Sequence, residues 1–179
     1  MCPLYSNVER IFYLNLITMK KQDYHFSYEV YASETDLAAS DADLLKQARD
    51  ITKIAYAPYS NFLVGAVAKL VNGEIVVGTN QENASYPVGI CAERVLLSSL
   101  SSLFPNVAIE TMAISYHSVL GKSDKPVSPC GMCRQALVEY ENRTKKPFRL
   151  ILSGMEGEVF VVEKADQLLP LSFTSDDLK

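Results

Sequence analysis

Residues 91–103 read CAERVLLSSLSSL, and the rest of the chain is best interpreted outward from this stretch. Its apolar residues recur at the spacing of one helical face, which predicts a helix over 91–103. The buried stripe of this helix consists of Val95, Leu96, Leu97 and Leu100. A second cysteine-led helix is predicted over 130–141, introduced by Pro129. The sequence therefore predicts two helices that each begin at a cysteine.

One further helix and several strands are predicted around these two helices. A helix over 40–56 has apolar residues at helical spacing, Ser40 and Asp41 as caps, and Pro58 beyond its end. Asn72-Gly73 between two apolar runs is a strong signal for a hairpin. The remaining predictions are strands over 24–32, 62–70, 74–78, 108–116, 148–152 and 158–162, and a short helix over 165–169. This order favours the α/β class: a three-layer α/β/α sandwich with a mixed sheet of about five strands, to which the strand over 24–32 is an extra one.

The length and composition are those of one globular domain with a tail. The chain has 179 residues, of which 48% are hydrophobic and 21% are charged. We divide it into an N-terminal extension over 1–39 and a domain over 40–179. Residues 1–18 look unlike the rest. One interpretation is that translation starts naturally at Met19 and the first stretch is an upstream artefact; the alternative is a mobile tail.

The charge excludes some classes of partner. The formal net charge is -4, which argues against a general binder of nucleic acid or anionic membranes, because such proteins present a basic field. No apolar run approaches the about 18 residues of a spanning helix, and the short run Ile11–Ile17 lacks the flanks of a signal peptide. We therefore expect a cytoplasmic protein, in which clustered cysteines indicate metal binding or catalysis more often than disulfides.

The cysteines are spaced for a catalytic metal. Cys130 and Cys133 are three residues apart, so both sulfurs can point the same way from the first helical turn. Backbone N–H groups at a helix start favour the thiolate form that zinc needs. Cys91 from the other helix completes three ligands, and the fourth position of one Zn²⁺ per chain is then left for water or hydroxide. Glu93, two residues after Cys91, can face that water and carry its proton.

Two other readings of Cys130-Gly131-Met132-Cys133 stay open at this point. The pair alone could be a thioredoxin-like redox motif or half of a structural zinc site. The structural site lacks a good fourth ligand, because Cys2 lies in the unusual leader and His25 and His117 are isolated. Redox chemistry does not explain Glu93 beside Cys91. A Cys two residues before a Glu, followed by Pro-Cys-x-x-Cys, is the pattern of zinc nucleobase deaminases.

Five segments in order resemble the motifs of cytidine deaminases, in the short, zinc-dependent, homotetrameric branch of the cytidine/deoxycytidylate deaminase family. They are APYSNFLVGA at 57–66, NQENASYP at 80–87, GICAER at 89–94, SPCGMCRQ at 128–135 and LLPLSF at 168–173. The resemblance runs from about residue 40 to the end. It implies hydrolytic deamination of free cytidine and deoxycytidine to uridine, deoxyuridine and ammonia in pyrimidine salvage, with Zn²⁺ as cofactor.

The resemblance also implies roles for individual residues in catalysis and base binding. Glu93 would take the proton of the metal-bound water, protonate N3 of cytosine and later assist the departure of ammonia. The backbone of Ala92 and the carbonyl of Ser128 would hold the edge of the base. Arg94 would donate to the thiolate sulfurs and offset their charge; the alternative is an exposed helix cation.

The remaining implied roles concern the sugar and the assembly. Asn80 and Glu82 would bind the 3′-hydroxyl of the ribose, and Phe62 would pack near the sugar and the base. Phe173 would reach the site of a neighbouring subunit in a homotetramer; the alternative is an ordinary core phenylalanine. The chain departs from the short branch in having about 40 residues before the first helix, which puts the tetramer arrangement in doubt.

Three competing functions stay open on the sequence. A deaminase of a modified or antibiotic cytosine nucleoside differs mainly in its sugar contacts, and Asn80 and Glu82 speak against it. A zinc-stabilised binding protein without activity has no use for Glu93 beside an open metal position. A thiol redox protein would use Cys130 and Cys133 without bound metal.

Overall fold

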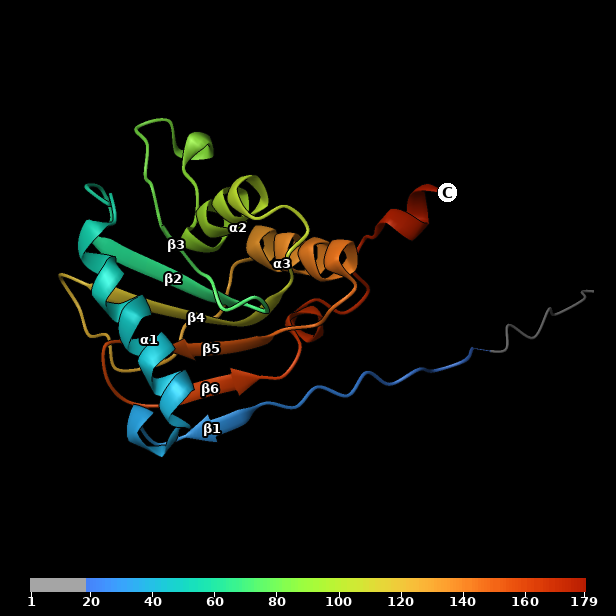
Figure 1. Ribbon diagram of the computed structural model, residues 1–179, viewed down its shortest axis with the longest axis horizontal. Coiled ribbons are helices and arrows are strands. Elements are labelled where there is room, and N and C mark those ends of the chain that lie inside the picture. Colours follow the sequence, from blue (N-terminus) through green and yellow to red (C-terminus); the bar gives the residue numbers. More distant parts are fainter. Residues whose placement is uncertain (1–18) are drawn as a thin grey trace, which may run out of the picture.

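The computed structural model describes residues 19–179, and the fold in Figure 1 is a six-stranded mixed sheet between helices. The predictions for residues 1–18 and for the start of translation lie outside the described residues. The strands are β1 Glu29–Tyr31, β2 Phe62–Leu70, β3 Ile75–Thr79, β4 Ile109–Ser118, β5 Arg149–Ser153 and β6 Val159–Val162. The α-helices are α1 Ala39–Ile51, α2 Ala92–Leu103 and α3 Gly131–Thr144. Short 3-10 helices span Glu34–Asp36, Thr52–Ile54, Tyr86–Val88, Ala165–Leu168 and Ser175–Leu178.

The sheet has the order β1-β6-β5-β4-β2-β3, and β4 and β5 are the only neighbouring strands within it that pair parallel. Helix α1 covers one face, where Leu44, Leu45 and Ala48 pack on the sheet. Helices α2 and α3 cover the other face, which holds the larger group of buried residues. The predicted three-layer α/β/α sandwich is confirmed. No helix between residues 19 and 179 has the length and apolarity needed to cross a membrane.

The sheet has six strands rather than about five, because the predicted extra strand joins it. Only Glu29–Tyr31 of the predicted strand over 24–32 is regular, and it pairs antiparallel with β6 at the sheet edge. The hairpin prediction is confirmed: β2 and β3 pair antiparallel around a turn in which Gly73 has φ 89°. Glycine adopts this left-handed conformation without the steric cost that a side chain brings.

The first helix differs from its prediction at both ends. Its N-cap is Ala38, without a side-chain cap hydrogen bond, so the prediction that Ser40 and Asp41 cap the helix is wrong. The Asp41 carboxylate instead pairs with Arg149 of β5 at 3.0 Å. The α-helix ends at Ile51 and is followed by one 3-10 turn over Thr52–Ile54, before the predicted end at residue 56.

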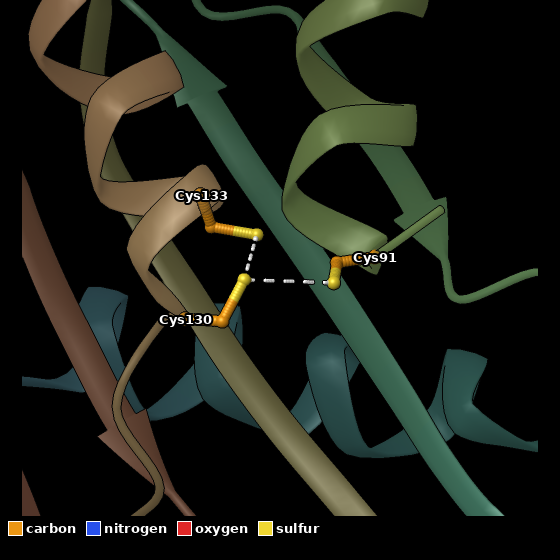
Figure 2. Close-up of side chains that lie close together, drawn as sticks. All are labelled: Cys91, Cys130 and Cys133. Atoms are coloured by element: carbon orange, nitrogen blue, oxygen red, sulfur yellow. Dashed lines mark hydrogen bonds between the residues drawn. The ribbon is translucent and has the colours of Figure 1, made fainter. Parts of the chain in front are cut away.

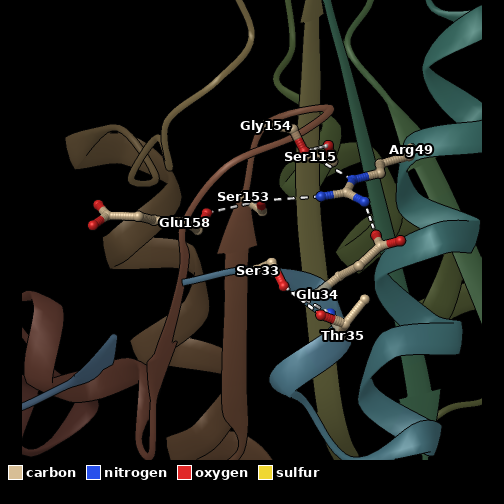
Figure 3. Close-up of polar contacts among 8 residues, drawn as sticks. All are labelled: Ser33, Glu34, Thr35, Arg49, Ser115, Ser153, Gly154 and Glu158. Atoms are coloured by element: carbon tan, nitrogen blue, oxygen red, sulfur yellow. Dashed lines mark hydrogen bonds and ion pairs between the residues drawn. The ribbon is translucent and has the colours of Figure 1, made fainter. Parts of the chain in front are cut away.

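Arg49 of α1 joins the segment that follows β1 to the sheet (Figure 3). Its guanidinium pairs with the Glu34 carboxylate in the 3-10 helix Glu34–Asp36. The same guanidinium donates to the Gly154 carbonyl at 2.9 Å and to Ser153 Oγ at 3.4 Å, just beyond and at the end of β5. The segment before α1 is thus held by backbone pairing with β6 and by this side-chain network.

Gly78 in β3 lets α2 approach the sheet closely, and α2 carries Cys91 and Glu93 at its start. A Cβ at Gly78 would lie 2.5 Å from both the Ala92 carbonyl oxygen and the Leu96 backbone nitrogen. These contacts are with backbone, so the helix itself would have to move.

We expect Gly78→Ala to lower the free energy of unfolding by about 1–3 kcal/mol, the usual cost of overpacking. The measurement is the urea midpoint of unfolding. Gly131→Ala is the matched control, because nothing lies within 4 Å of a Cβ added there. Equal midpoints for the two variants would show that α2 does not depend on this close approach.

Candidate active site

Three cysteine side chains meet where α2 and α3 begin, on the same face of the sheet. Cys91 is the N-cap of α2 and Cys130 is the N-cap of α3, while Cys133 lies in the first turn of α3. Figure 2 shows the sulfurs turned toward one another. The Cys91 and Cys130 sulfurs are 3.8 Å apart, those of Cys130 and Cys133 are 3.4 Å apart, and all three lie within 4.8 Å. The spacing that the sequence suggested therefore brings the three thiols together.

The chemistry of these donors fits Zn²⁺. Zinc–sulfur bonds are about 2.3 Å long and tetrahedral, so thiolates on one ion lie about 3.8 Å apart. Hydrogen bonding with the Cys133 thiol lowers the pKa of Cys91 to about 6. The same interaction, together with burial, raises the pKa of Cys133. The charge of a divalent cation stabilises thiolates, so a cation bound here would allow all three sulfurs to ionise.

Glu93 lies in the first turn of α2, beside this cluster. Its side chain is buried, with 5% relative exposure, and burial raises the pKa of its carboxyl group. Interaction with the Cys133 thiol and the charge of Arg94 act in the opposite direction. A buried carboxylate beside a metal site is placed to exchange protons rather than to form a surface ion pair.

Cys91, Cys130 and Glu93 belong to the lining of a pocket of about 400 Å³. Seven residues singled out from the sequence line it: Phe62, Asn80, Glu82, Cys91, Glu93, Ser128 and Cys130. Four others were missed by sequence reasoning: Ser60, Val64, Ile114 and Val127. Ser60 and Val64 alternate with Phe62 around the start of β2, so the strand period could have suggested them. Ile114 and Val127 carry no signal that distinguishes them from core residues.

Asn80 and Glu82 belong to the lining of the pocket, and the side chain of each binds nearby backbone groups. The Asn80 side-chain amide donates to the Phe62 carbonyl at 2.9 Å and accepts from the Val64 N–H at 2.7 Å. Glu82 Oε2 accepts from the backbone N–H groups of Tyr59 at 2.9 Å and Ser60 at 3.3 Å. Hydrogen bonding from the Ser60 side chain is the largest cause that lowers the pKa of Glu82, and the two backbone N–H groups act in the same direction. Glu82 is therefore an ionised carboxylate fixed through one oxygen.

Phe62 forms a flat wall of the pocket. Its ring stacks on that of Tyr116 in β4, with centroids 4.7 Å apart and planes inclined by 16°. Tyr116 is buried, so the phenylalanine ring has little freedom to turn. A fixed aromatic face of this kind suits a planar ligand.

Four predicted site residues lie outside the lining of this pocket, and one of them is Cys133, whose buried sulfur nevertheless belongs to the cysteine cluster. Ala92 is fully buried in the first turn of α2. Arg94 borders a different hollow, between α2 and α3, and makes no hydrogen bond to the three sulfurs within the described residues. Its charge nevertheless lowers the pKa of Cys91. Phe173, with 59% exposure, lies in the C-terminal segment, where its carbonyl accepts a hydrogen bond from Gln135.

Comparisons with known proteins agree with this arrangement. Residues 38–146 match the family described as "Cytidine and deoxycytidylate deaminase zinc-binding region". The cytidine deaminase of Halalkalibacterium halodurans is 34% identical over 135 residues, which cover 75% of this chain and 95% of the relative. That of Sporosarcina psychrophila is 33% identical over 135 residues, covering 75% and 92%. The crystal structure of cytidine deaminase from Burkholderia pseudomallei superposes with a TM-score of 0.64 at 34% identity, covering 76% of this chain and all of that one.

Proposed function

This chain belongs to the cytidine and deoxycytidylate deaminase family, and we propose from that membership which residues perform its reaction. The protein is a zinc-dependent hydrolase that converts cytidine and water into uridine and ammonia. The observation that carries the residue assignment is that Glu93, two of the three clustered cysteines and the Glu82 carboxylate line one pocket. Equal amounts of uridine and ammonia formed from cytidine support the proposal, and unchanged cytidine contradicts it.

Cys91, Cys130 and Cys133 hold the zinc. Bound zinc supplies a Lewis acid that brings the pKa of a water molecule toward neutrality. The Glu93 carboxylate accepts a proton from the attacking water, delivers one to N3 of the ring, and then assists protonation of the departing amino group. The carbonyl of Ser128 and the backbone of Ala92 hold the edge of the base. The C4–N bond breaks, a C4–O bond forms, and no electrons are gained or lost overall.

The pocket selects a free nucleoside. Its volume of about 400 Å³ suits one nucleoside rather than a strand of nucleic acid. Phe62 offers its flat face to the base and the sugar. Glu82 and Asn80 bind the 3′-hydroxyl, and we therefore propose deoxycytidine as a second substrate, because it keeps that group.

We expect Glu82→Gln to lower kcat/KM for cytidine by about 10- to 150-fold, corresponding to the about 1.5–3 kcal/mol of a hydrogen bond to a charged group. The amide can still accept from Tyr59 and Ser60, so the turn should keep its shape. With 3′-deoxycytidine the unaltered protein should already be slow, and the substitution should add little.

The measurement is kcat/KM for both nucleosides with both proteins. Glu74→Gln, an exposed carboxylate in the β2–β3 turn, is the control and should match the unaltered protein. An equal loss by Glu82→Gln on both nucleosides would show that Glu82 does not recognise the 3′-hydroxyl.

The alternatives fit less well. A modified or antibiotic nucleoside differs mainly in its sugar, so this alternative would not explain the proposed contacts of Asn80 and Glu82 with the 3′-hydroxyl. A thiol redox function does not account for the buried Glu93 or for the matching relatives. Cytidine deamination therefore explains more of the site than either alternative.

We also propose a setting for the enzyme, on the strength of the family resemblance. The protein acts in pyrimidine salvage in the cytoplasm, as a homotetramer whose sites lie near subunit interfaces. The exposed side chains of Phe173 and Leu171 support the proposal that Phe173 reaches a neighbouring site. Arg94 tunes the charge of the thiolates, and residues 1–39 form an extension to a deaminase domain over 40–179. Light scattering measures the mass of the assembly.

A further inference from the structure

Arg134 and Gln135, the two residues that follow Cys133, donate side-chain hydrogen bonds to backbone carbonyls outside the pocket. Arg134 Nε donates to the Pro129 carbonyl at 2.9 Å, and its Nη1 donates to the Leu168 carbonyl at 3.0 Å. Pro129 immediately precedes Cys130, and Leu168 ends the 3-10 helix Ala165–Leu168. One guanidinium thus joins the cysteine loop, defined here as the peptide from Pro129 to Cys130, to a part of the chain more than thirty residues away.

Helix α3 holds the C-terminal segment, defined here as residues 165–173, at two further points. Gln135 Nε2 donates to the Phe173 carbonyl at 2.8 Å. The buried Glu141 carboxylate accepts from the backbone N–H groups of Ala165 at 3.1 Å and Asp166 at 2.9 Å. The segment is therefore fastened at its start by Glu141, near its middle by Arg134 and at its end by Gln135.

We propose that Arg134 is a positioning residue that couples the metal site to the C-terminal segment. Its hydrogen bond to Pro129 fixes the peptide that leads into Cys130, and so limits where the Cys130 sulfur can lie. The same guanidinium fixes Leu168. Because the two contacts share one rigid planar group, movement of the cysteine loop displaces the segment, and release of the segment loosens the loop.

An arginine is suited to this task because its guanidinium presents several N–H donors in a fixed fork. A lysine has one compact ammonium on a flexible stem and cannot reproduce both directions at once. The coupling is reciprocal by linkage: if bound zinc orders the segment, the ordered segment strengthens zinc binding by the same factor. Partners that orient metal ligands typically change metal affinity about 10- to 100-fold when they are removed.

The inference rests on the zinc ligands proposed above, and its test needs no substrate. The measurements are the rate of zinc release to a chelator and the hydrogen exchange of residues 165–173, followed by mass spectrometry. We expect Arg134→Ala to release zinc at least about tenfold faster and to exchange faster across the segment. We expect Gln135→Ala to exchange faster only near Phe173, with zinc release unchanged.

Arg143→Ala is the matched control on the same helix, because Arg143 contacts Ser101 Oγ and the Tyr140 ring and neither end of the coupling. Arg134→Lys keeps the positive charge but loses the fixed set of N–H donors, so it should behave like Arg134→Ala. The lysine variant replaces the alanine variant in the test if the alanine variant fails to fold. Zinc release from Arg134→Lys at the unaltered rate would overturn the inference. If the unaltered protein holds no zinc, the ligand assignment itself fails, which is a different result.

Discussion

Glu93→Gln is expected to lower kcat for cytidine by about 10²–10⁴-fold while the protein keeps its zinc and its fold. The side chain is buried beside the cysteine cluster and is not one of the proposed ligands. Glutamine has nearly the same shape and can hydrogen-bond, but it cannot accept and return a proton. Each proton transfer between water, ring and leaving group then loses its carrier.

The measurement combines turnover, zinc content and thermal unfolding of the same preparation. Glu139→Gln is the control, because Glu139 is an exposed carboxylate on α3 that borders the hollow between the helices rather than the pocket. It should retain full activity. A Glu93→Gln protein with one zinc per chain and a kcat within tenfold of the unaltered protein would remove Glu93 from the proton-transfer role.

Cys130→Ala is expected to abolish stable zinc binding and to lower the stability of the domain. Two thiolates hold zinc far more weakly than three, and metal that binds only the folded chain adds to its stability. At a free zinc concentration about 1,000 times Kd this linkage contributes about 4 kcal/mol. For a chain of this size, such a loss corresponds to a fall in Tm of about 10 °C.

Metal analysis and thermal unfolding with and without a chelator test this expectation. The chelator should lower the Tm of the unaltered protein and leave that of Cys130→Ala unchanged. Cys2→Ala is the chemical control, since Cys2 is outside the proposed ligand set, and it should respond to the chelator as the unaltered protein does. Cys130→Ala with a full complement of zinc would exclude Cys130 as a ligand.

The helices that carry the site could be predicted well from local sequence. Cys91 and Cys130 stand immediately before runs with helical periodicity, and both became N-caps. The caps of the first helix could not be predicted in the same way. Aspartate is a common N-cap residue, yet the Asp41 carboxylate pairs with Arg149, more than a hundred residues away. Such pairing cannot be predicted from local sequence, because it forms only in the folded sheet.

The site was predicted where motifs carry chemistry and missed where it depends on packing. The motifs indicated Asn80 and Glu82, but not that both side chains bind the backbone near the start of β2. The motif at 128–135 includes Arg134, but it did not indicate that the guanidinium joins Pro129 to Leu168. Side chains that bind distant carbonyls leave no periodic signal, because their partners are backbone groups common to all residues.

The most direct test of the account is the ultraviolet absorbance of cytidine mixed with protein as purified, after zinc removal, and after one zinc per chain is restored. The same series with deoxycytidine, cytosine and CMP defines the substrate. The account predicts rapid conversion of cytidine and deoxycytidine by the purified and restored proteins, and none without zinc. Turnover that is unaffected by complete removal of zinc, or no turnover of cytidine by the zinc-loaded protein, would contradict it.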